Sequence, residues 1–89
     1  MERVVYTAPE RVDAKTCVKV GEELNDIVKS GAKELVFDMA NLKYISSAGL
    51  RILLIKEKEM NGGFYITNIP PAVKEILDVT GFSSILQTL

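Results

Sequence analysis

The chain has 89 residues, of which 47% are hydrophobic and 26% are charged, and its formal net charge is −1. This composition is typical of a single globular domain covering residues 1–89 and argues against disorder. The sequence has no basic block for nucleic acid, no apolar run of the roughly 18–20 residues that span a membrane, and no secretory signal at its N-terminus.

The rare residue types restrict the chemistry further. The chain has no histidine, so it lacks the commonest general base and metal ligand and cannot build a Ser-His or Cys-His nucleophile. It also has no Walker loop and no glycine-rich fingerprint after a strand. We therefore expect no enzyme activity, no catalytic residue, no metal and no cofactor. The single cysteine, Cys17, excludes an internal disulfide and favours a cytoplasmic location, and its helical spacing predicts a small core residue.

The predicted elements begin with a strand at 3–8, where β-branched and aromatic residues are concentrated. A helix within 13–31 follows, because apolar residues recur there at helical spacing. Either Asp13 or Thr16 is suited to cap its start, and Gly31 stands just beyond its end.

The later elements continue the alternation of strand and helix. They are a strand at 34–39, a helix within 48–63, a strand at 63–69, a helix at 70–81 and a short apolar tail at 82–89. The charged run Lys56–Glu59 reads as a solvated helix face.

The order β-α-β-α-β-α predicts an α/β domain with a mostly parallel sheet. Leu35 and Phe37 share one face of their strand and Val36 the other, whereas a sheet covered on both faces lacks such alternation. We therefore expect the helices mainly on one face. Tyr6, Val36 and Tyr65 are candidates for the less covered face.

The junction at 46–49 allows two interpretations. Ser46 is a competent N-cap for the next helix, with Gly49 allowing a close helix–sheet contact. A cap needs only one serine, however, and a second, Ser47, would present its hydroxyl at the carboxyl edge of the sheet, where ligands and partners usually bind. The turns at 9–13 and 68–71 are expected at the same edge.

Two stretches carry a resemblance to a known family. "VFDMANLKYISSAGLRILL" and the later "GGFYITNIPPAVKEILDVTGF" resemble the STAS domain of anti-sigma factor antagonists, and the similarity extends over nearly the whole chain. The positions that match the family pattern in register are Asp38, Ser46, Ser47, Ala48, Gly49 and Leu50.

The resemblance implies a cytoplasmic bacterial regulator that binds an anti-sigma factor, often also a serine kinase, and so frees a sigma factor. It implies that phosphorylation of Ser47 blocks this binding and that a phosphatase, such as one of the PP2C type, reverses the modification. The expected partner-binding residues are Asp13, Ser46, Ser47, Ala48, Gly49 and Asn68, of which Asp13 and Asn68 are included for the position of their turns at the same edge. Asp38 and Gly49 are expected to be structural, and the protein to be a monomer or weak homodimer. The alternative is a STAS subunit that is never phosphorylated and regulates another complex, such as a transporter.

The chain departs from the family pattern at three places. Ser46 stands where an aspartate is often found, which removes a carboxylate that could assist kinase recognition. Arg51 stands where several members have a second glycine. The family's first N-terminal strand is missing or reduced to Met1 and Glu2, so the strand at 3–8 is expected to be an exposed edge.

Overall fold

The computed structural model describes residues 3–89, and within them it has six strands, three α-helices and one 3-10 helix. In chain order these are β1 (Arg3–Thr7), β2 (Arg11–Val12), α1 (Cys17–Lys29), β3 (Glu34–Asp38), β4 (Tyr44–Ile45), α2 (Ser47–Met60), β5 (Phe64–Thr67), α3 (Pro71–Thr80), η1 (Phe82–Ser84) and β6 (Gln87–Thr88). The predicted alternation of strands and helices is confirmed.

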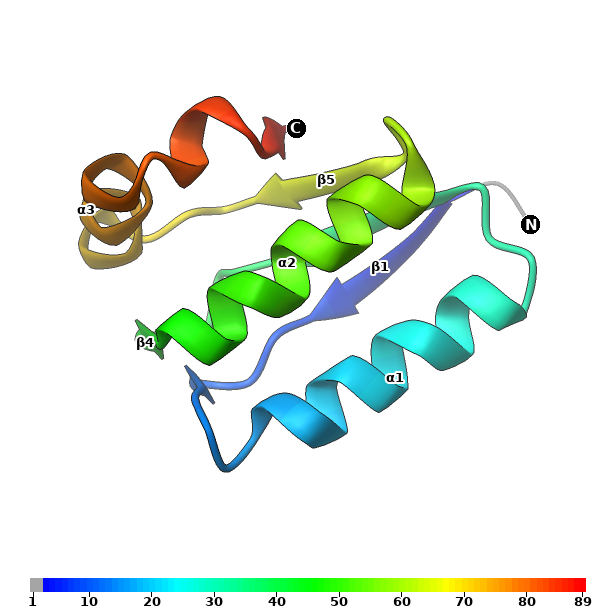
Figure 1. Cartoon of the computed structure of the whole chain (residues 1–89), viewed down its shortest axis with the longest axis horizontal. Coiled ribbons are helices and arrows are strands. Elements are labelled where there is room, and N and C mark those ends of the chain that lie inside the picture. Colours follow the sequence, from blue (N-terminus) through cyan, green and yellow to red (C-terminus); the bar gives the residue numbers. More distant parts are fainter. Residues whose placement is uncertain (1–2) are drawn as a thin grey trace.

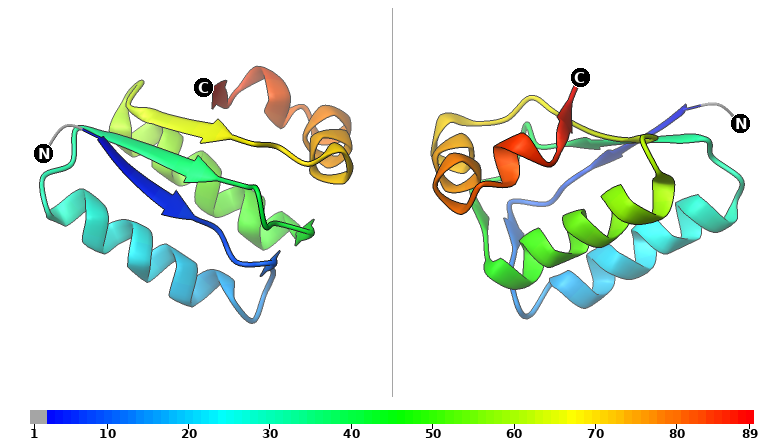
Figure 2. Two further views of the ribbon diagram at one scale, coloured as in Figure 1. Left: turned by 180° about the vertical axis from the view of Figure 1, so that it is seen from behind. Right: turned by 45° about the horizontal axis from the view of Figure 1, so that its top comes forward.

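A four-stranded sheet in the order β1-β3-β5-β6 forms the centre of the domain, and all its strand pairs are parallel. Figure 1 shows α1 and α2 side by side on one face of this sheet, and Figure 2 shows the opposite face free of helices. The remaining helix, α3, lies beyond the end of β5 (Figure 1). The one-sided arrangement predicted from strand alternation is therefore confirmed.

The core lies between the sheet and the helices. It contains the inward-facing strand residues Leu35, Phe37, Phe64 and Ile66, each at most 1% exposed. Helix α1 contributes Val20 and Leu24 from its apolar stripe, while α2 contributes Leu50 and Leu53. Cys17 is only half-buried, because it begins α1 at the rim of this core.

One of the residues predicted for the less covered sheet face lies on the other side. Tyr6 pairs in register with Phe37 and stacks on its ring with centroids 5.7 Å apart. Its hydroxyl donates a 2.6 Å hydrogen bond to Glu23 on α1, so Tyr6 faces the helices. Val36 and Tyr65 do lie on the open face, where they are neighbours in register; Val36 is nevertheless buried because strand neighbours flank it on both sides.

The prediction of a solvated face at Lys56–Glu59 is wrong for Lys56. This lysine is 3% exposed, and its ammonium group hydrogen-bonds to the side chains of Asn25 and Glu59. Its long aliphatic stem makes such burial possible, since the charged end still reaches polar partners.

The helix ends follow the glycine and proline signals. Gly31 and Gly81 have positive φ angles of 94° and 83° just beyond α1 and α3, where an L side chain would be strained. Pro71 opens α3 at a position where its missing N–H costs nothing. Strand β1 is an edge of the sheet, as expected; Met1 and Glu2, the residual first strand of the prediction, lie outside the described residues.

Candidate functional site

The candidate site lies where the parallel strands end and α2 begins. Two very short strands, β2 and β4, pair there in parallel and hold together the segments that follow β1 and β3. The backbone N–H of Ser46 donates to the carbonyl of Val12 at 2.9 Å. This ladder sets residues 13–16, the Asp13 loop, beside Ser46 at the start of α2.

The two serines have different positions. Ser46 has extended backbone angles (φ −90°, ψ 174°), and its hydroxyl oxygen accepts a 3.3 Å hydrogen bond from the N–H of Gly49. It is therefore the N-cap of α2 and is half-buried. Ser47 is the first residue of the helix and is exposed. Capping thus occupies Ser46 and leaves the Ser47 side chain at the surface.

Gly49 allows α2 to approach the β2–β4 ladder closely. A Cβ atom at this position would lie 2.8 Å from the carbonyl oxygen of Val12 and 2.7 Å from the side chain of Ile45. Any side chain would therefore push the helix away. Gly49 is buried and offers no open surface, so its placement supports the structural role.

Asp13 organises its own loop. Its carboxylate accepts hydrogen bonds from the N–H groups of Lys15 and Thr16, while its own N–H donates to the Thr16 hydroxyl at 2.9 Å. Arg11 adds an ion pair at 3.2 Å. The Thr16 backbone bond, followed by the Arg11 and Lys15 contacts, holds the pKa of Asp13 below its usual value. Asp13 and Thr16, the two residues proposed as caps, thus hold the loop before α1 together by reciprocal hydrogen bonds.

Asp38 and Asn68 form a second part of the edge. The Asp38 carboxylate accepts from the N–H of Ala40 at 2.9 Å and from the Asn68 side chain at 3.1 Å. Asn68 is exposed and has a positive φ of 54°, a conformation that asparagine tolerates better than most residues. Within residues 3–89, no hydrogen bond joins Asn68 to Ser46 or Ser47. The predicted residues therefore form two neighbouring groups along one edge.

A polar group that was not predicted from the sequence lies away from this edge, between α1 and α2, and is formed by Lys56, Asn25 and Glu59. A signal was present, because Lys56 follows Leu53 by three residues on the buried stripe of α2.

Across residues 3–89 the structure has no cluster of three or more His, Cys, Asp or Glu side chains that could hold a metal. None of the helices described is both long and apolar enough to cross a bilayer.

Comparison with known families identifies the class of protein. The family model for the STAS domain matches residues 2–89, which is nearly the entire chain. The chain therefore belongs to the STAS domain family.

A curated relative carries the name of an anti-sigma factor antagonist. BtrV of Bordetella bronchiseptica, which its name assigns to the anti-sigma factor antagonists, is 34% identical over 77 residues. The match covers 83% of this chain and 66% of BtrV, so the aligned region is slightly less than two thirds of the relative.

Solved structures share the fold at lower identity. An anti-sigma factor antagonist from Mycobacterium paratuberculosis is 20% identical with a TM-score of 0.87, covering 97% of this chain and 75% of that one. The anti-sigma factor antagonist SpoIIAA in its unphosphorylated form is 15% identical with a TM-score of 0.81, covering 99% and 80%. The phosphorylated form of Bacillus SpoIIAA is also similar, with a TM-score of 0.71, 14% identity, and 98% and 82% covered.

Proposed function

We propose that this chain is an anti-sigma factor antagonist whose binding is controlled by phosphorylation of Ser47. It binds an anti-sigma factor that is also a serine kinase, and a sigma factor is released. Phosphorylation of Ser47 blocks this binding, and a PP2C-type phosphatase restores it. The observation that carries the proposal is that the two serines have different environments. Ser46 caps α2, whereas Ser47 is exposed in the first turn of the helix.

The proposed binding surface is preformed. Asp13 is fixed by bonds within its loop, and Asn68 is tied to Asp38. Ala48 is half-buried beside Ser47. A surface held in this way loses little conformational entropy when a partner binds.

Phosphorylation is expected to leave the fold intact. Ser47 stands at a helix N-terminus, where unpaired N–H groups and the positive end of the helix dipole favour an anion. Arg51 is exposed one turn further along α2, at the spacing at which opposite charges attract. The domain itself can therefore accommodate the phosphate.

The complex is where the phosphate acts. The modification adds about −1.5 to −2 charges and three acceptor oxygens to a surface that otherwise carries a small hydroxyl. Against one partner carboxylate, the repulsion is on the order of a few kcal/mol. Since about 1.4 kcal/mol corresponds to a factor of ten, the affinity falls by roughly a hundredfold or more.

The proposal is tested with a purified anti-sigma factor kinase from the same genome. Calorimetric titration should give tight binding for the wild type and for Ser47→Ala, and strongly weakened binding for Ser47→Asp. With ATP, mass spectrometry should find one phosphate on the wild type and none on Ser47→Ala, which retains Ser46. Binding of Ser47→Asp as tight as wild type would contradict the switch, and unmodified Ser47 would indicate a STAS subunit that is not regulated in this way.

A further inference from the structure

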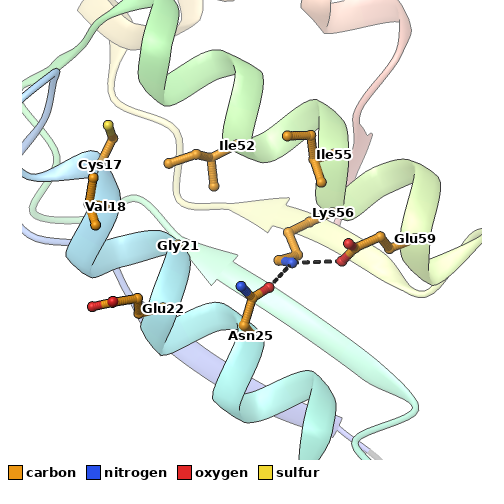
Figure 3. A pocket seen from close by; sticks show the side chains of 9 residues that line it. All are labelled: Cys17, Val18, Gly21, Glu22, Asn25, Ile52, Ile55, Lys56 and Glu59. Atoms are coloured by element: carbon orange, nitrogen blue, oxygen red, sulfur yellow. Dashed lines mark hydrogen bonds and ion pairs between the residues drawn. The ribbon is translucent and has the colours of Figure 1, made fainter.

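A groove of about 360 Å³ lies between α1 and α2, on the side of the helices that faces away from the sheet (Figure 3). Its α1 wall begins at Cys17 and continues through Val18 and Gly21 to Asn25. Its α2 wall runs from Ile52 to Glu59. The α1 wall alone is about 12 Å long at 1.5 Å per residue, which corresponds to slightly more than two helical turns.

The groove exposes apolar side chains that the domain does not cover. Val18 is 65% exposed and Ile55 is 43% exposed, on opposite walls. Gly21 contributes no side chain, and even an added Cβ would reach only ordinary contact with Ile52, 3.8 Å away. The space between the helices therefore comes from a missing side chain and is open to an occupant.

The polar groups of the groove are acidic in balance. Lys56 forms the floor at one end, and its ammonium is already bonded to Asn25 and Glu59 (Figure 3). Glu22 lies on the α1 rim, and none of the ion pairs among residues 3–89 engages it. One positive and two negative side chains thus line the groove, so it complements an apolar surface that carries a basic group.

The groove also adjoins the proposed binding edge. Both helices begin at the same edge of the sheet, where the Asp13 loop precedes α1 and Ser46 precedes α2 (Figure 1). Cys17, the first residue of α1, already belongs to the groove wall. A partner that contacts Ser47 can therefore extend the same contact surface, without interruption, into the groove between α1 and α2.

We infer that the α1–α2 groove is a second contact for the same partner and receives an amphipathic helical segment of the anti-sigma factor. This inference rests on the proposed function. The segment places a short apolar stripe on Val18, Ile52 and Ile55, and a lysine or arginine on the flank that faces Glu22. This is helix-in-groove recognition, in which anchors at i, i+3 and i+4 supply the apolar contact.

The test compares matched substitutions in titrations with the anti-sigma factor used for the Ser47 variants. Val18→Asp places a charge in the groove, and Val79→Asp makes the same change at an 81% exposed valine on α3. Both positions are exposed, but the helix dipole favours a carboxylate in the first turn of α1 and disfavours one in the last turn of α3, so the unfolding temperature of each variant is measured beside its affinity. We expect Val18→Asp to weaken binding by about tenfold or more and Val79→Asp to have no effect, since buried unpaired charges are costly and exposed ones are not. Glu22→Lys should weaken binding in the same direction.

A direct readout uses Cys17, the single thiol of the chain, which lies in the groove. Saturating partner should slow its alkylation by iodoacetamide. Wild-type affinity for Val18→Asp together with unprotected Cys17 would overturn the groove contact, while the Ser47→Asp result would still decide the proposed function. Failure of the wild type to bind would overturn both. Self-association of the chain that Val18→Asp abolishes would assign the groove to a second copy and also overturn the inference.

Discussion

Gly49 is the residue on which the approach of α2 to the proposed binding edge depends. Atoms of Val12 and Ile45 occupy the space where a side chain at position 49 would lie, and they leave no room for a methyl group. We predict that Gly49→Ala destabilises the domain by about 1–3 kcal/mol, because overpacking displaces the helix. Gly21→Ala is the control, since that glycine is also inside a helix but has open space. It should be neutral or stabilising by up to about 1 kcal/mol in urea unfolding; equal losses for both would contradict the packing argument.

Lys56 tests whether the stem or the charge of a buried lysine matters more. Its side chain is 4% exposed, whereas its acceptor Glu59 is 50% exposed and can be solvated by water. Lys56→Met keeps the stem, and we predict a change in the free energy of unfolding within about 1 kcal/mol. Lys56→Ala should cost about 1–3 kcal/mol, because it leaves a cavity. A large loss in Lys56→Met would show instead that the ammonium bonds dominate.

At the scale of elements, the start of α2 should separate the roles of the two serines. Ser46→Ala removes the cap on the Gly49 N–H and should cost about 1 kcal/mol. Ser47→Ala changes an exposed side chain and should stay within about 0.5 kcal/mol of the wild type. Chemical denaturation of the two variants measures both values, and a larger loss for Ser47→Ala would reverse the assignment of cap and exposed hydroxyl.

The loop between β2 and α1 should make a pH-dependent contribution to the stability of the folded domain. The pKa of Asp13 is lowered in the folded protein, so its stabilising bonds are fully present above the unfolded value, about 4, and are lost as pH falls through the folded value. Asp13→Asn should therefore be less stable than the wild type at pH 7. The difference should shrink as pH falls below about 4 in a series of thermal unfolding scans; a constant difference would exclude the ionised carboxylate as its cause.

The main elements were predictable because each has a strong local signal. Helical spacing of Val20 and Leu24 and alternation around Leu35 predicted which faces are buried. The two-residue strands β2 and β4 carry no pattern long enough to detect, since their pairing depends on chain segments that meet only in the fold. Tyr6 was assigned to the wrong face because its polar hydroxyl finds a partner on α1 inside the helix-covered side.

At the scale of the whole molecule, the sequence predicted the site only in part. The serine junction and its position at the sheet edge followed from element order and from the resemblance to STAS domains. The hydrogen bonds between Asp13 and Thr16 depend on local side-chain geometry, and the Asp38–Asn68 bond joins two segments that are 30 residues apart in the sequence. The burial of Lys56 was not predicted because its charge indicates an exposed residue, and its helical spacing from Leu53 was given less weight than that charge.

Under the proposed function, a phosphate on Ser47 changes the binding surface of a rigid domain and leaves its fold intact. The most direct test measures the affinity of the chain for the proposed anti-sigma factor partner with phosphoserine installed at position 47, beside the unmodified chain. We expect roughly a hundredfold or greater loss of affinity with an unchanged circular dichroism spectrum. Equal affinity of the two forms would contradict it.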